Sequence, residues 1–168
     1  AIVLLIAAIL LLTTPAAALH PAHDVNQYGH TAWALREGAV TRFPRAITQT
    51  PDGYLWLGTD HGLLRFDGVR FEAWQPPPGH ALPSDVVVEL LSARDGTLWI
   101  GTTHGLASWR GGKLTHYARL AGEFVGALLE DRDGTLWAGT NGGNGAATLC
   151  AIRPANVHCV GGDGTFGR

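Results

Sequence analysis

The sequence predicts an all-β protein made of repeated four-stranded units. Two observations carry this prediction: an eight-residue motif that recurs three times, and apolar runs of strand length separated by glycine-rich turns. The chain has 168 residues, of which 46% are hydrophobic and 15% charged, a composition that supports a buried core and excludes a disordered chain. Its 12 Lys and Arg face 14 Asp and Glu with no basic block, so we expect no nucleic-acid partner.

The recurring motif opens with Asp-Gly, carries Trp at its fifth position and ends in Gly-Thr. Its repeated residues are Asp52, Gly53, Trp56 and Gly58; Asp95, Gly96, Trp99 and Gly101; and Asp133, Gly134, Trp137 and Gly139. The motifs begin 43 and then 38 residues apart, and the insertion 142–146 restores the period, because Phe66, Trp109 and Ile152 are again 43 apart. Each motif therefore belongs to one unit of constant size.

Each unit is predicted to contain four strands. The first carries Ile47, Leu90 or Leu128 and leads into the Asp-Gly turn, which is a strong hairpin signal. The Leu-Trp-x-Gly-Thr run forms the second strand, and the third ends at Phe66, Trp109 or Ile152. A four-residue turn, 67–70 or 110–113, then leads to the fourth strand at 71–74 or 114–117. Four antiparallel strands in about 40–45 residues predict a β-propeller blade.

The predicted organisation is a partial propeller of about three blades plus an N-terminal closing strand. The blades span 43–81, 82–121 and 122–160, and 161–168 is the start of a truncated further blade. Within an N-terminal segment 19–42, Ala32-Trp33 aligns with Ala73-Trp74 and is predicted to close a blade elsewhere in the protein. Because closure takes at least four blades, we expect an arc whose open apolar sides promote association.

Residues 1–18 are predicted to be a signal peptide cleaved after Ala18. An unbroken apolar run ends at Leu12, too short for the roughly 20 residues of a spanning helix, and Pro15 and three alanines follow it. The alternative is a buried hydrophobic helix. Since the chain opens with Ala1 and contains no Met, we expect a fragment or a trimmed product. Export would place the mature chain in the periplasm or outside the cell.

Several segments carry a resemblance to a known family. They are 30–33, 46–59, 62–71 and 128–134, and they resemble the two-component regulator propeller repeats over Asp24 to Arg168. The resemblance implies the periplasmic sensor region of an inner-membrane sensor or hybrid histidine kinase, in which two seven-bladed propellers precede an immunoglobulin-like domain, a membrane helix and a kinase. The third unit departs from the pattern, with Thr148 in place of the Gly before its third strand.

Because no phosphoacceptor-histidine helix and no ATP-binding box occur, this chain is predicted to be non-enzymatic input machinery that needs no cofactor. Its expected partners are an extracellular small molecule or oligosaccharide, the remaining blades, and a second copy in a dimeric parent. One alternative is a stand-alone exported propeller that acts as a binding or scaffold module. Another is a propeller glycoside hydrolase or lyase, since 92–99 is similar to a sialidase Asp-box, but the three turn aspartates stand a blade apart and build no carboxylate pair.

The repeated tryptophans are predicted to pack between blades, because the same residue recurs in every unit. His61 and His104 fall at equivalent rim positions, but the third unit has no counterpart and zinc needs three or four ligands, so we expect solvated loop residues and no metal. His20, His23 and His30 are expected to form a solvated linker.

The two cysteines are predicted to form a disulfide. A turn over 153–156 makes Ile152 face Val157 and therefore Cys150 face Cys159, and opposed residues of an antiparallel pair lie within disulfide reach. An exported chain meets an oxidising compartment. The alternative is a pair of buried free thiols. The bond would clamp the hairpin that follows the insertion.

Overall fold

The computed structural model describes residues 43–141, 147–153 and 156–161, and within them the chain forms three four-stranded antiparallel sheets. The first blade contains β1 (Pro44–Gln49), β2 (Leu55–Thr59), β3 (Gly62–Phe66) and β4 (Phe71–Ala73). The second contains β5 (Val87–Ser92), β6 (Leu98–Thr102), β7 (Gly105–Arg110) and β8 (Lys113–His116), followed by the 3-10 turn η2 (Ala118–Leu120). The third contains β9 (Phe124–Glu130), β10 (Leu136–Asn141), β11 (Ala147–Arg153) and β12 (Asn156–Gly161).

Strands follow one another in sheet order within each blade, so every connection is a hairpin. The predicted fold class, a partial propeller of four-stranded blades, is confirmed. The signal peptide, the closing strand at 32–33, the N-terminal histidines and the start of a further blade lie outside the described residues. Among the described residues, no helix has the length and apolar character needed to cross a bilayer.

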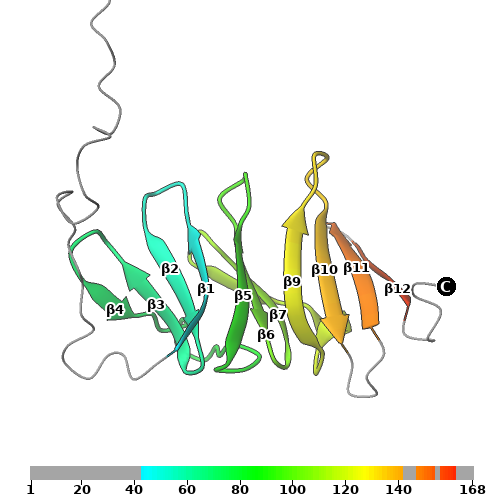
Figure 1. The fold of residues 1–168 in the computed structure, drawn as a ribbon, viewed down its shortest axis with the longest axis horizontal. Helices are drawn as coiled ribbons and strands as arrows, with labels where there is room; N and C mark the ends of the chain where they lie inside the picture. Colours follow the sequence, from blue (N-terminus) through cyan, green and yellow to red (C-terminus); the bar gives the residue numbers. More distant parts are fainter. Residues whose placement is uncertain (1–42, 142–146, 154–155, 162–168) are drawn as a thin grey trace, which may run out of the picture. The chain divides into compact units, whose positions relative to one another are not determined.

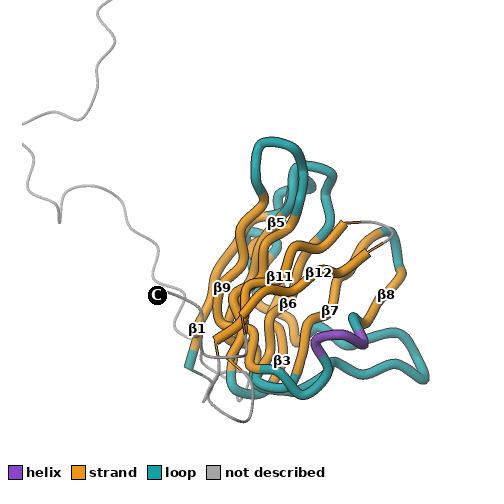
Figure 2. Tube along the Cα trace, turned by 90° about the vertical axis from the view of Figure 1, so that its right-hand side faces the viewer, coloured by secondary structure: helices purple, strands orange, loops and turns teal. Residues whose placement is uncertain are grey.

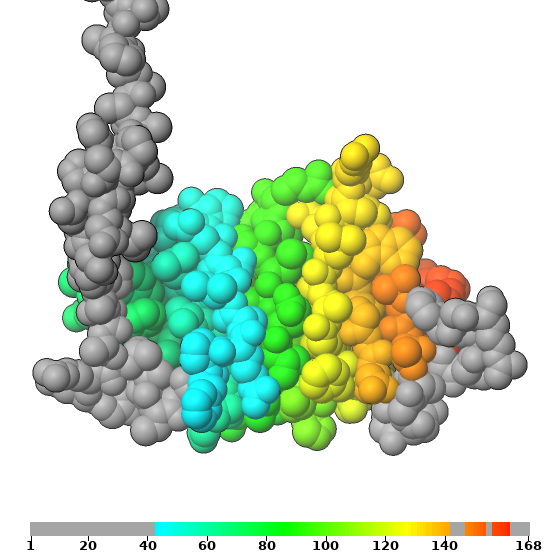
Figure 3. Space-filling model, viewed as in Figure 1, coloured from blue at the N-terminus to red at the C-terminus, as the bar shows by residue number. Residues whose placement is uncertain are grey.

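The three blades stand side by side in sequence order, as the ribbon and the space-filling view show (Figures 1 and 3). From blade to blade, β1 and β2 contact β5, and β5 and β6 contact β9, while β3, β7 and β11 lie further out in their sheets (Figure 2). One apolar cluster, which includes Trp56 and Ile100, fills the space between the first and second blades. A second cluster, which includes Leu106 and Cys150, fills the space between the second and third. The core therefore lies between sheets.

The first strand of every blade carries a bulge at the same place. The register of β1, β5 and β9 shifts by one residue at Arg45, Val88 and Gly126, each seven residues before the Asp of the motif. A bulge bends its strand and increases the local twist. The residue before the bulge, Val87 or Val125, is fully buried against the preceding blade.

The motif glycine of the second strand lets neighbouring blades approach closely. A Cβ placed on Gly58 would lie 2.6 Å from a methyl group of Val87, and one on Gly101 would lie 2.6 Å from the carbonyl oxygen of Val125. Real Cβ atoms do not come this close, so no larger residue fits without moving the next blade. At Gly139, the nearest atom would be Cβ of Ala127 in the same blade, at 3.3 Å.

The third blade differs where the sequence departs from the repeat. In the first two blades, the motif threonine donates its hydroxyl proton to the carbonyl oxygen of the facing glycine, Thr59 to Gly62 and Thr102 to Gly105, both at 2.8 Å. In the third blade Thr140 faces Thr148, and the ladder continues to Asn141 and Ala147. The buried Thr140 hydroxyl has no hydrogen-bond partner among the described residues.

The predicted turn 110–113 is wrong in its length. Arg110 and Lys113 are paired, so β7 and β8 join through two residues, Gly111 and Gly112, with φ of 54° and 84°. Two consecutive positive φ values match the twist of the flanking strands, which explains the shorter hairpin. The equivalent turn in the first blade keeps four residues, because the Asp67 carboxylate accepts hydrogen bonds from the backbone N–H groups of Val69 and Arg70.

The predicted register of the last hairpin is confirmed: Ile152 faces Val157, Ala151 faces His158 and Cys150 faces Cys159. Arg153 and Asn156 are also paired, so the predicted turn 153–156 is two residues too long, like the turn 110–113. A disulfide joins the two cysteines, and Cys150 is fully buried in the cluster between the second and third blades. The β12 strand ends at Gly161, one residue beyond the predicted end of this blade.

Labelling of the unfolded, unreduced protein with a thiol reagent should find no reactive cysteine. Reduction before unfolding should lower the free energy of unfolding by about 2 kcal/mol, the low end for a disulfide, because the closed loop is short. Two labelled thiols per chain without reduction would show that the bond does not form.

Candidate ligand-binding site between the second and third blades

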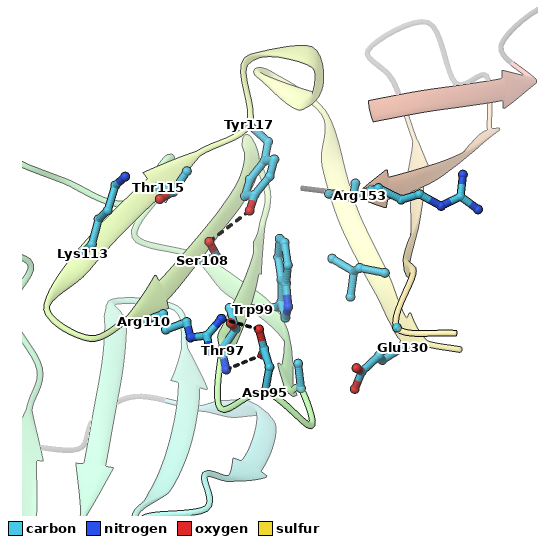
Figure 4. A pocket seen from close by; sticks show the side chains of 14 residues that line it. Asp95, Thr97, Trp99, Ser108, Arg110, Lys113, Thr115, Tyr117, Glu130 and Arg153 are labelled. Carbon is cyan, nitrogen blue, oxygen red and sulfur yellow. Dashed lines mark hydrogen bonds and ion pairs between the residues drawn. The ribbon is translucent and has the colours of Figure 1, made fainter. Parts of the chain in front are cut away.

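The outer halves of the second and third blades enclose a cavity of about 350 Å³. Its wall on the second blade carries Trp99 on β6, Ser108 and Arg110 on β7, Tyr117 after β8, and Asp95 in the motif turn (Figure 4). The third blade contributes Leu136, Ile152 and Glu130, with Arg153 at the end of β11. The cavity is therefore lined by aromatic, hydroxyl and charged side chains from two sheets.

The matching space between the first and second blades is smaller, about 240 Å³. There Trp74 and Trp109 pack edge to face with ring centroids 5.2 Å apart, and Trp74 also packs against Trp56. The Arg65 guanidinium lies 4.5 Å from the ring centre of Tyr54 and pairs with Glu72 at 3.3 Å. Large side chains thus occupy the outer half of this first gap.

Five positions are smaller in the second gap, which explains the larger cavity. By register, Thr97, Ser108, Thr115 and Tyr117 stand where the first blade has Tyr54, Arg65, Glu72 and Trp74, and Ile152 stands where the second blade has Trp109. The remaining aromatic pair, Trp99 and Tyr117, has ring centroids 5.1 Å apart at an interplanar angle of 38°. Lost side-chain volume on both walls leaves the space open.

The indole N–H of the motif tryptophan has a different environment in each blade. Trp56 donates to the Thr50 hydroxyl at 2.9 Å, and Trp137 donates to the Asp131 carboxylate at 2.8 Å. The equivalent residue of the second blade is Ala93, which has no side-chain acceptor, and Trp99 Nε1 has no hydrogen-bond partner among the described residues. Trp99 lines the cavity and is half-buried, so its N–H is available to a ligand.

Hydrogen bonds fix the polar groups at the lower edge of the cavity in Figure 4. Asp95 accepts from the backbone N–H of Thr97 at 2.9 Å and from Arg110 at 2.6 Å. Desolvation opposes ionisation of Asp95, but the hydrogen bonds from Thr97 and the charge of Arg110 together lower its pKa, so the carboxylate is charged at neutral pH. Burial raises the pKa of Tyr117, whose hydroxyl is 3.1 Å from that of Ser108.

Arg94 connects the two blades at the rim beside the cavity. Its backbone N–H donates to Glu130 at 2.9 Å, and its Nε lies 3.2 Å from the same carboxylate. The two terminal nitrogens donate to the backbone carbonyl oxygens of Asp131 and Arg132. Arg94 stands directly before Asp95, so one turn both lines the cavity and holds the next blade.

The residues singled out in the sequence have separate places. The motif aspartates lie in three exposed turns, and only Asp95 lines the cavity between the second and third blades. Trp56 is buried between blades as predicted for packing, whereas Trp99 also lines this cavity. His61 and His104 occupy equivalent exposed turns, where His61 Nδ1 contacts Asp60 and His104 Nδ1 contacts the Thr103 hydroxyl. Three-residue clusters of metal-binding side chains do not occur in the described part of the chain.

Comparison within the sequence could have found the cavity. One signal is Ala93, which stands where the other two repeats have Thr50 and Asp131. The other signal is Ile152, which stands where the second repeat has Trp109. The repeats differ at these positions, whereas the blades were predicted from positions at which the repeats agree.

The fold and the inter-blade packing define consecutive blades of a β-propeller. Three segments, 39–61, 81–104 and 119–142, match the model of the two component regulator propeller, and each covers the first two strands of one blade. The chain thus carries three repeats that match this family. A comparison with curated proteins gave no match.

Solved structures from B. thetaiotaomicron share the fold. The extracellular domain of the putative hybrid two component system BT3049 is 22% identical, with a TM-score of 0.52 over 64% of this chain and 15% of that chain. The extracellular domain of the putative one component system BT4673 is 22% identical, with a TM-score of 0.57 over 70% and 17%. The chain thus spans about a sixth of the length of either domain.

Substituting Arg94 tests the contact between the second and third blades. Arg94→Ala removes the side-chain contacts to Glu130 and to two carbonyl oxygens, and should lower the free energy of unfolding by about 1 kcal/mol, since Arg94 is largely exposed. The matched control is Arg132→Ala, because Arg132 holds the same position in the third blade and its side chain forms no hydrogen bond or ion pair with a described residue. This substitution should cost less than about 0.5 kcal/mol. Equal costs in urea unfolding would refute the inter-blade role.

Proposed function

We propose that this chain is part of the ligand-sensing propeller region of a two-component sensor and works in the periplasm. The observation that carries the proposal is the family match in all three blades. Support comes also from the solved structures of the same fold, which are described as extracellular domains of two component or one component systems. In this proposal the kinase or other output domain is outside the chain.

The proposed stimulus is an extracellular small molecule or oligosaccharide. The cavity between the second and third blades supports this choice, because its half-buried indole and its hydroxyl groups suit a polar ring-shaped molecule. The first and third blades also have unpaired apolar faces. Ile47 is 66% exposed and Leu129 is 62% exposed. The residues at the equivalent register positions of the second blade pack against the neighbouring blades. Further blades of the complete protein are the proposed partners of these faces, and the complete sensor is proposed to be a dimer.

Reporter fusions after Arg168 test the periplasmic location. Alkaline phosphatase, which folds only where its disulfides can form, should be active when fused to residues 1–168, and inactive when residues 1–18 are deleted. Green fluorescence from an equivalent fusion that folds only in the cytoplasm, together with inactive phosphatase, would refute the proposed location. Deletion of 1–18 is the matched control, since it leaves every described blade intact.

A further inference from the structure

The cavity between the second and third blades has two donors without a partner among the described residues, beside hydroxyl groups that can donate or accept. The Trp99 N–H has no partner, and Lys113 forms no ion pair within the described part of the chain. The carboxylates are already engaged. Asp95 accepts from Thr97 and Arg110, and Glu130 accepts from Arg94. A ligand that pairs with these two donors must bring hydrogen-bond acceptors.

Charge around the cavity favours an anion. Three cationic and two anionic side chains line it, and both anions are paired with arginines. Arg110 and Lys113 are directly opposed across β7 and β8, and of the two only Arg110 has an anionic partner; the Lys113 side chain extends away from the Arg110 guanidinium in Figure 4. A bound anion would give Lys113 an anionic partner. In the first gap, the equivalent of Lys113 is Arg70, which pairs with Glu72 at 2.9 Å.

An apolar surface lies beside these donors. Trp99 is half-buried, Tyr117 packs against it, and Leu136 and Ile152 line the facing wall. The Arg153 side chain points away from Trp99 in Figure 4, and its Nε donates to the Thr135 hydroxyl at 3.1 Å. A ligand in this space contacts an aromatic face on one side and aliphatic side chains on the other.

We propose that this cavity binds a small organic anion with one apolar ring face. The ring lies against Trp99, an acceptor atom takes the Trp99 N–H, and the anionic group lies by Arg110 and Lys113. The inference rests on the proposed sensor function and deepens it, because it assigns the stimulus a site and a charge. Sugar acids and aromatic acids share this chemistry.

Calorimetric titration of the complete protein tests the ligand class with two matched pairs. D-glucuronate is compared with D-glucose, and benzoate with benzamide, so that each pair keeps its ring and changes its charge. At least one acid should bind about tenfold more tightly than its neutral partner, the effect of one charge-assisted hydrogen bond. The pair that responds tells whether the ring is a sugar or an aromatic one.

Substitutions locate the binding in the cavity. Lys113→Gln should weaken binding of the acid about tenfold, while Arg70→Gln, the same change in the first gap, should leave it unaltered. Ala93→Thr supplies the acceptor that Trp56 has in Thr50, and should weaken binding by occupying the Trp99 N–H. Tyr117→Trp with Ile152→Trp recreates the aromatic pair of the first gap, and should abolish binding without lowering the melting temperature.

Three results would overturn the inference: neither acid binds, acid and neutral partner bind equally, or Lys113→Gln and Arg70→Gln weaken binding alike. These results leave the sensor proposal intact if the reporter fusions show export. Failed export with tight, Lys113-dependent binding of an acid would instead refute the periplasmic sensor and retain the site.

Discussion

The close approach of consecutive blades at the motif glycine is the constraint on which the rest of the structure depends. A single sheet cannot cover both of its faces, so each blade is stable only against a neighbour. Val87 and Val125 reach the preceding blade where Gly58 and Gly101 have no side chain. The bulge that follows each valine bends the first strand at this point. Glycine, bulge and valine together set the spacing between blades.

That spacing leaves the outer half of each gap free to vary. The inner contacts are alike in both gaps, whereas the outer contacts are an aromatic pair in the first and an open cavity in the second. A change there alters what fills the gap without moving the blades apart. A repeated scaffold can therefore keep one gap as packing and use another as a site. Arg94 adds a polar contact at the rim of the gap that contains the larger cavity.

The sequence predicted the blades well because the signals are local and repeated. The strand order followed from the Asp-Gly turns, the apolar runs of strand length and the 43-residue period. The same signals predicted the register around Ile152 and the facing cysteines. The predicted turns 110–113 and 153–156 were two residues too long, because the strand ladders continue to the pairs Arg110–Lys113 and Arg153–Asn156. The cavity was not predicted, since it depends on the sizes of side chains that meet from different blades, such as Tyr117 and Ile152.

Equilibrium unfolding of Gly101→Ala beside Gly139→Ala tests the glycine constraint most directly. The same substitution is made at the same motif position, but only Gly101 faces the backbone of a following described blade. In the 168-residue chain, Gly101→Ala should lower the free energy of unfolding by about 2 kcal/mol, and Gly139→Ala by less than about 1 kcal/mol. Equal losses, or no loss at Gly101, would contradict the account that this glycine sets the spacing of the blades.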